Sequence, residues 1–121
     1  MTIPNTPAIH AGNTLYIGGT PPVDSEGNLI AANDVGKQTA AIFERMDALL
    51  AQAGMTREHL VFVTVYLLDL TDYTAMNSVY AENVRLPYPA RKVIQTPLTI
   101  DGMRVEMTAI ASTQPRLAIT V

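Results

Sequence analysis

Apolar residues recur along the chain with two different periods, and the change of period separates a helix from a strand. Between residues 35 and 53 they return every three or four positions, which predicts a helix. Asn33 or Asp34 can cap this helix, and Gly54 supplies its stop. Residues 60–70 are instead dense in β-branched and aromatic side chains, so this segment predicts the strongest strand of the chain.

Shorter segments complete the predicted fold. A second helix is expected to begin near Thr71-Asp72 and to end before Pro87, because the residue before a proline avoids helical geometry. Further strands are predicted at residues 8–11, 14–17, 92–96 and 104–111, with tight turns at Gly12-Asn13 and Asp101-Gly102. The order β-β-α-β-α-β-β is typical of an α+β sandwich, with two helices on one mostly antiparallel sheet.

The long strand has apolar side chains on both of its faces. One face presents Leu60, Phe62, Tyr66 and Leu68, and the other presents Val61, Val63, Val65 and Leu67. Two helices can cover only one face of a sheet this small, so we expect a second copy of the chain to cover the other. The alternative is a surface face that is simply apolar at this one strand.

Composition limits the classes of protein to which this chain can belong. The chain has 121 residues, 48% of them hydrophobic and 16% charged, which predicts one folded domain over residues 1–121. A net charge of −3 disfavours nucleic acid as a partner, since phosphate binding needs clustered Lys and Arg. The absence of cysteine excludes a disulfide, a thiolate metal site and a cysteine nucleophile. Neither a membrane-spanning apolar run nor a signal peptide is evident, which predicts a cytoplasmic protein.

Arg91 and Glu106 are the residues whose surroundings suggest chemistry. Arg91 opens a strand after the rigid Pro89-Ala90 step, and Glu106 lies in an apolar strand, where a carboxylate needs a partner. If the two strands are neighbours, both side chains can share a face. Arginine would then bind a substrate carboxylate through two hydrogen bonds, while glutamate would handle a proton or a water. The alternative is an ordinary cross-strand ion pair.

Other polar residues offer weaker signals. His10 and His59 have no second ligand at metal-binding spacing and are interpreted as exposed surface residues. Gly18-Gly19 follows a strand without opening a helix, so it is no phosphate loop, but its backbone N–H groups can approach a ligand. Lys37 and Lys92 are the only lysines, and neither lies clearly in an apolar pocket, which disfavours a Schiff-base mechanism.

The same residues carry a resemblance to a known family. Pro89-Ala90-Arg91, with Glu106 fifteen residues after the arginine, resembles the C-terminal signature of the Rid (YjgF) family of enamine/imine deaminases. Residues 12–19 resemble its first hairpin, residues 64–69 its central strand and residues 76–82 its second helix. The likeness covers residues 8–113, and the spacing from arginine to glutamate fits without a gap.

This resemblance implies a chorismate-mutase-like fold and a homotrimer with ligand clefts between its subunits, without metal or organic cofactor. The implied reaction is hydrolysis of carboxylate-bearing enamines or imines to 2-keto acids and ammonia. Arg91 would bind the substrate carboxylate, and Glu106 would position the attacking water. Asn77 would support the site, and backbone at Gly19 would face the ligand. The implied partners are a small carboxylate-bearing metabolite and other copies of the chain, with neither nucleic acid nor membrane.

The sequence departs from the family pattern at several positions. Asn5 stands where the family usually has tyrosine, Gly18 where it has serine, Lys92 where it has a small residue and Thr108 where it has a second glutamate. Deamination is the leading hypothesis, because Arg91 and Glu106 are retained. The alternative is a non-catalytic trimer that binds a keto or amino acid in the same cleft, which the lost hydroxyl groups favour. Ribonuclease activity, reported for some relatives, is disfavoured by the acidic charge balance and the missing histidine pair.

Overall fold

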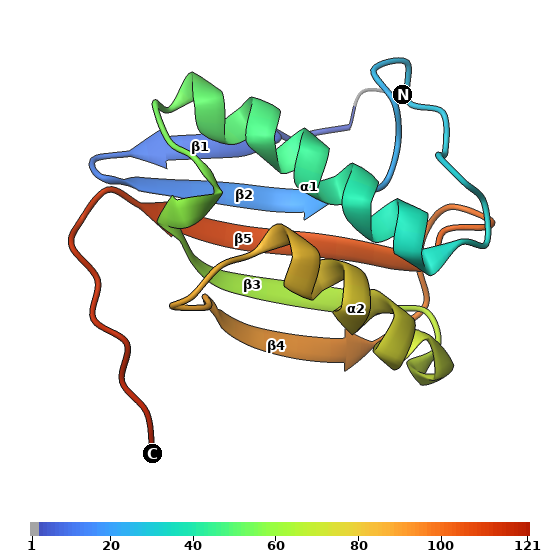
Figure 1. The fold of residues 1–121 in the computed structure, drawn as a ribbon. Coiled ribbons are helices and arrows are strands. Elements are labelled where there is room, and N and C mark those ends of the chain that lie inside the picture. Colours follow the sequence, from blue (N-terminus) through green and yellow to red (C-terminus); the bar gives the residue numbers. More distant parts are fainter. Residues whose placement is uncertain (1–2) are drawn as a thin grey trace.

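The strands of the chain form one mixed sheet, shown in Figure 1. The computed structural model describes residues 3–121, and the sheet has the strand order β1-β2-β5-β3-β4. The strands are β1 (Ala8–Ala11), β2 (Thr14–Thr20), β3 (Leu60–Leu67), β4 (Ala90–Gln95) and β5 (Val105–Ser112). Neighbouring strands pair antiparallel except β3 and β4, which are parallel. The predicted order of elements and the mostly antiparallel sheet are confirmed.

Both α-helices lie on one face of this sheet (Figure 1). They are α1 (Val35–Gln52) and α2 (Tyr73–Asn83), and they pack against each other. Asp34 caps α1 as predicted, because its carboxylate accepts a hydrogen bond of 2.9 Å from the Lys37 backbone N–H. Gly54, with a φ of +70°, lets the chain turn just after α1, so both predicted helix signals are confirmed.

The segment between β3 and α2 differs from the prediction. Strand β3 already ends at Leu67, and a short 3-10 helix over Leu70–Asp72 leads into α2. The Asp69 carboxylate favours this early stop, because it accepts a hydrogen bond of 2.8 Å from the Thr71 backbone N–H and so stabilises a turn. Helix α2 consequently begins at Tyr73.

The hydrophobic core lies between the helices and the sheet. Its fully buried side chains include Ile42, Phe43, Met46, Leu50, Val63, Val65, Leu67, Met76 and Met107. In β5, alternate residues from Val105 to Ala111 point into this core, as the predicted alternation requires. The helix-covered face of the sheet is therefore closed within a single chain.

No helix within residues 3–121 covers the opposite face of the sheet (Figure 1). This open face consists of Ile9, Tyr16, Phe62, Thr64, Tyr66, Lys92, Ile94, Glu106, Thr108 and Ile110, which the strand registers place on one side. Its apolar side chains stay partly in water: Phe62 is 37% exposed and Tyr16 is 50% exposed. Strand β3 is thus apolar on both faces as predicted, but the predicted face of Leu60 is wrong, because a register shift between Leu60 and Phe62 places Leu60 in the core. The second copy expected to cover the open face stays a prediction.

A buried glutamine joins the loops at one end of the sheet. Gln38 on α1 donates through Nε2 to the backbone carbonyls of Ala31 and Gly102, at 3.1 and 2.9 Å. Its Oε1 accepts a hydrogen bond of 2.8 Å from the Arg104 backbone N–H. The Arg104 guanidinium in turn forms an ion pair of 2.5 Å with Asp72. These contacts hold the starts of α2 and β5, the elements that carry site residues, in one arrangement.

Candidate functional site

Arg91, on β4, is held against helix α2. Its Nη1 donates a hydrogen bond of 2.5 Å to Asn77 Oδ1, and its Nη2 donates one of 3.3 Å to the Tyr73 hydroxyl. The guanidinium carbon lies 4.8 Å from the ring centroid of Tyr80 and 5.9 Å from that of Tyr73. Asn77 therefore lies directly beside Arg91, the place that its expected supporting role requires.

Tyr73 and Tyr80 are site residues that sequence reasoning did not single out for chemistry. They lie four residues before and three residues after Asn77, so the helical period places all three on one side of α2. This spacing is the signal that could have identified them. Tyr80 is only 6% exposed, and its hydroxyl has no hydrogen-bond partner within residues 3–121. Burial raises the pKa of Tyr80 to about 12, although the Arg91 charge acts in the opposite direction.

A cavity of about 390 Å³ opens beside the Arg91 guanidinium. Its lining consists of Asn77, Tyr80, Ala81, Val84, Tyr88, Pro89 and Arg91. Apart from Asn77 and Arg91 these residues are apolar or aromatic, so the cavity offers one cation within an apolar wall. A guanidinium has five N–H donors, and those that Asn77 and Tyr73 leave unused are enough to bind a carboxylate.

Glu106, on β5, lies on the open face next to Gly19. A Cβ atom added to Gly19 would lie 3.3 Å from Glu106 Oε2, so a larger residue there would crowd the carboxylate. Glu106 is opposite Tyr66 in the pairing of β5 with β3. Burial raises the pKa of Glu106 above its ordinary value of 4.5, because the charged form loses contact with water. The structure thus brings Gly19 and Glu106 together.

Arg91 and Glu106 lie on opposite faces of the sheet, so the predicted shared face is wrong for a single chain. Arg91 is in register with the core residue Val63 and therefore points toward the helices. Glu106 is in register with Tyr66 and points to the open face. The interpretation as a cross-strand ion pair is wrong for the same reason. Both assumed that β4 and β5 are neighbours, whereas β3 lies between them.

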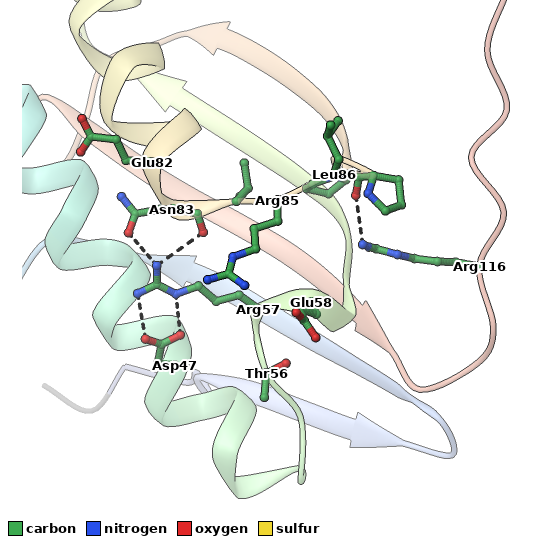
Figure 2. A pocket seen from close by; sticks show the side chains of 12 residues that line it. Asp47, Thr56, Arg57, Glu58, Glu82, Asn83, Arg85, Leu86 and Arg116 are labelled. Atoms are coloured by element: carbon green, nitrogen blue, oxygen red, sulfur yellow. Dashed lines mark hydrogen bonds and ion pairs between the residues drawn. The ribbon is translucent and has the colours of Figure 1, made fainter.

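A larger cavity, of about 690 Å³, lies next to the first and contains none of the predicted site residues (Figure 2). Arg57 is fixed in its wall by Asp47, whose two carboxylate oxygens accept hydrogen bonds of 2.7 and 2.8 Å. A third bond, of 2.6 Å, runs from Arg57 to Asn83 Oδ1. Arg116 donates to the backbone carbonyl of Pro87. Because these arginines already have partners, this region ties α1, α2 and the C-terminal segment together.

Comparisons with known proteins identify the family. The family model described as Endoribonuclease L-PSP matches residues 3–113. A RutC family protein of Pyrococcus abyssi is 37% identical over 108 residues, which are 89% of this chain and 85% of the relative. The 3-aminoacrylate deaminase RutC of Acinetobacter baylyi is 32% identical over 108 residues, which are 89% of this chain and 86% of the relative.

A solved structure gives the same result. RidA from the Antarctic bacterium Psychrobacter sp. PAMC 21119 superimposes with a TM-score of 0.84 at 31% identity, covering 93% of this chain and 90% of that one. The chain belongs to the Rid (YjgF) family. The resemblance seen in the sequence is therefore confirmed, and the fold it implied is confirmed with it.

The departures from the Rid pattern fall in two places. Asn5 is exposed ahead of β1, and Gly18 lies within β2. Lys92 and Thr108 instead lie on the open face, where both are in register with Thr64 of β3. Lys92 therefore adds a positive charge to the face of the sheet that carries the predicted catalytic carboxylate.

The histidines take no part in this site. His10 is exposed as predicted, but His59 is half-buried, because its Nδ1 accepts a hydrogen bond of 2.9 Å from the Thr56 backbone N–H. This bond closes the short 3-10 helix Arg57–His59, which leads into β3.

Within residues 3–121, no group of three or more His, Cys, Asp or Glu is placed to hold a metal ion. No helix in that part of the chain is long and apolar enough to cross a membrane.

Proposed function

We propose that this Rid protein hydrolyses the C=N bond of carboxylate-bearing imines and enamines, releasing ammonia and a 2-keto acid. The observation that carries the proposal is the Arg91 guanidinium, fixed by Asn77 at the wall of an apolar cavity of about 390 Å³. A prearranged guanidinium binds a carboxylate in one orientation and so places the neighbouring imine carbon. The relationship to a 3-aminoacrylate deaminase supports the same chemistry.

The complete site requires more than one copy of the chain. Arg91 and Glu106 point to opposite faces of the same sheet, so one small substrate cannot touch both within one chain. Contact between the open face of one copy and the β4 edge of the next would bring Glu106 and Gly19 of the first to Arg91 and Asn77 of the second. The homotrimer with clefts between subunits, implied by the family resemblance, has this property.

The chemistry needs one acid–base group and one water. An enamine first becomes the imine by gaining a proton on its β-carbon and losing one from its nitrogen. The water oxygen then adds to the imine carbon while the Glu106 carboxylate takes one water proton and passes it to the imine nitrogen. In the resulting carbinolamine Glu106 moves the remaining hydroxyl proton to the amine nitrogen as the C–N bond breaks, so that ammonia and the 2-keto acid leave. Arg91 keeps its contact with the carboxylate throughout.

The apolar wall of the cavity favours larger substrates. Tyr80, Ala81, Val84 and Tyr88 offer surface to an apolar side chain next to the bound carboxylate. Asn5 and Gly18, which stand where the family has tyrosine and serine, do not line this cavity within one chain, but they remove volume and hydroxyl groups from a site that a neighbouring copy completes. Leucine- and phenylalanine-derived imines are therefore expected to react faster than the alanine-derived imine, which fills little of this space.

Keto-acid formation from imines generated in situ by an amino-acid oxidase tests the proposal. Wild-type protein should accelerate hydrolysis, and Arg91→Ala should lose at least about tenfold of that acceleration, since charged hydrogen bonds are lost. Arg85→Ala is the matched control, because it removes an exposed arginine that lines only the larger cavity. Absence of acceleration on every imine would overturn the proposal.

The second candidate is a non-catalytic protein that binds keto or amino acids in the same cleft. The absence of hydroxyl groups at Asn5 and Gly18 favours it, because fewer groups remain to position a water. Calorimetry distinguishes the two functions. Binding of 2-ketobutyrate that depends on Arg91, together with no hydrolysis of any imine, would establish the binding function instead.

A further inference from the structure

The strands of the sheet carry very few charged side chains. The five strand segments contain only Arg91, Lys92 and Glu106 as ionised residues. Arg91 points toward the helices, where Asn77 binds it. Lys92 and Glu106 are therefore one cation and one anion on an otherwise uncharged and mostly apolar open face.

Lys92 and Glu106 do not pair within one chain. Lys92 is in register with Thr64 and Glu106 with Tyr66, both on the intervening strand β3. The two residues lie on strands separated by β3 and are two residues out of step along the sheet, and no ion pair joins them within the described residues. The ion pairs within residues 3–121 are elsewhere, at Arg57–Asp47 and Arg104–Asp72.

Covering the open face changes the energetics of both charges. An ionised group that loses water without gaining a partner is strongly disfavoured. From the neighbouring strands Gly19 and Tyr66 face Glu106, and neither carries a positive charge. The nearest cation along its own strand, Arg104, is already bound to Asp72. A partner that brings a cation to Glu106 and an anion to Lys92 therefore stabilises both charges when it covers this face.

The open face of a second copy carries both the cation that Glu106 needs and the anion that Lys92 needs. We propose that, in the association of copies through the open face that the family resemblance implies, Lys92 of one copy donates to the Glu106 carboxylate of the next. This pairing rests on the proposed function, since it completes the site between copies. Lys92 is then a positioning residue that keeps Glu106 ionised and oriented toward the water. Phe62, Tyr66, Ile94 and Ile110 supply the apolar area around the pair.

Charge reversal tests the pairing directly. Lys92→Glu and Glu106→Lys should each weaken self-association at least about tenfold, because like charges then meet across the interface. The double variant K92E/E106K restores opposite charges and should return the association to within a few-fold of wild type. Sedimentation velocity or light scattering over a range of concentrations measures the effect.

Two further variants make the result decisive. Lys37→Glu applies the same charge change to the other lysine of the chain, which is exposed at the start of α1, and should leave association unchanged. Lys92→Met removes the charge but keeps an unbranched side chain, and it should weaken association even if a reversed charge prevents folding. Single variants that associate normally, or a double variant that fails to recover, would overturn the pairing. Arg91-dependent hydrolysis by wild-type protein would in that case still support the proposed function.

Discussion

The two faces of the sheet use similarly apolar sequence, yet the chain covers only one of them. Its two phenylalanines mark the difference: Phe43 on α1 is fully buried under the helices, whereas Phe62 on the open face is 37% exposed. Strand β3 contributes to both environments, because its alternate residues enter the core or face outward. The comparison teaches that one face is stabilised by the chain's own helices, while the other leaves apolar area in contact with water.

The candidate site residues are also divided between the two faces of the sheet. Arg91 belongs to the helix-covered side, where Asn77 and Tyr80 fix it through contacts within one chain. Glu106 belongs to the open face, beside Gly19, where its surroundings would change in the proposed association with another copy. Binding of the substrate carboxylate should therefore depend mainly on contacts within a single chain. Activation of the water by Glu106 should depend on the proposed association of copies.

The largest expected effect belongs to the covered face. Phe43→Ala should lower the free energy of unfolding by about 3–5 kcal/mol, because it leaves a cavity in the core. It also removes an edge-to-face contact with Tyr80 at 5.5 Å and the contact with Arg57 at 5.3 Å. Denaturant titration measures this loss. A loss below about 1 kcal/mol would contradict the distinction between the two faces.

Arg91→Lys is expected to have the next largest effect, now on ligand binding. The charge is kept, but an ammonium group cannot form two parallel hydrogen bonds to a carboxylate, and charged hydrogen bonds contribute roughly 1.5–3 kcal/mol each. Affinity for 2-ketobutyrate should therefore fall at least about tenfold in calorimetry. Arg85→Lys serves as the control, and unchanged affinity in the Arg91 variant would place the carboxylate site elsewhere.

Phe62→Ala should affect folding of the chain much less than Phe43→Ala, by about 1 kcal/mol, because the side chain is already partly in water. Its main effect should be on association. The melting temperature of an associating protein rises with its concentration, and this rise should be smaller in the variant. If the melting temperature of both proteins responds equally to concentration, Phe62 lies outside any interface.

The smallest expected effect is a gain, not a loss, in the free energy of unfolding. Tyr80→Phe keeps the ring that lies against Arg91 and removes a buried hydroxyl that has no partner within residues 3–121. The variant should gain up to about 1 kcal/mol in free energy of unfolding. Tyr88→Phe, whose side chain is 59% exposed, should show no change in the same denaturant titration. A clear destabilisation by Tyr80→Phe would mean that the hydroxyl does bind a partner.

Local patterns were sufficient for much of the fold and for the positions of the candidate residues within their strands and helices. Apolar periodicity with the Asp34 cap and the Gly54 stop predicted α1, and alternation in β5 correctly separated Glu106 from the core residues. Helix caps and side-chain alternation depend on a few consecutive residues, so the sequence displays them directly. The end of β3 was placed too late, because the turn at Asp69 is stabilised by a single side-chain hydrogen bond.

What the sequence by itself determined is which helices and strands the candidate site residues lie in and, within β5, which face each residue occupies. Only the tertiary structure decided that Arg91 and Glu106 lie on opposite faces of the sheet, and that Tyr73 and Tyr80 join Asn77 around the guanidinium. The physical reason is that strand order depends on pairing between distant segments. Strand β5 inserts between β2 and β3, and the parallel β4 follows β3 through helix α2. The strand order cannot be read from a local period in the sequence, because it depends on how the whole sheet packs against the two helices.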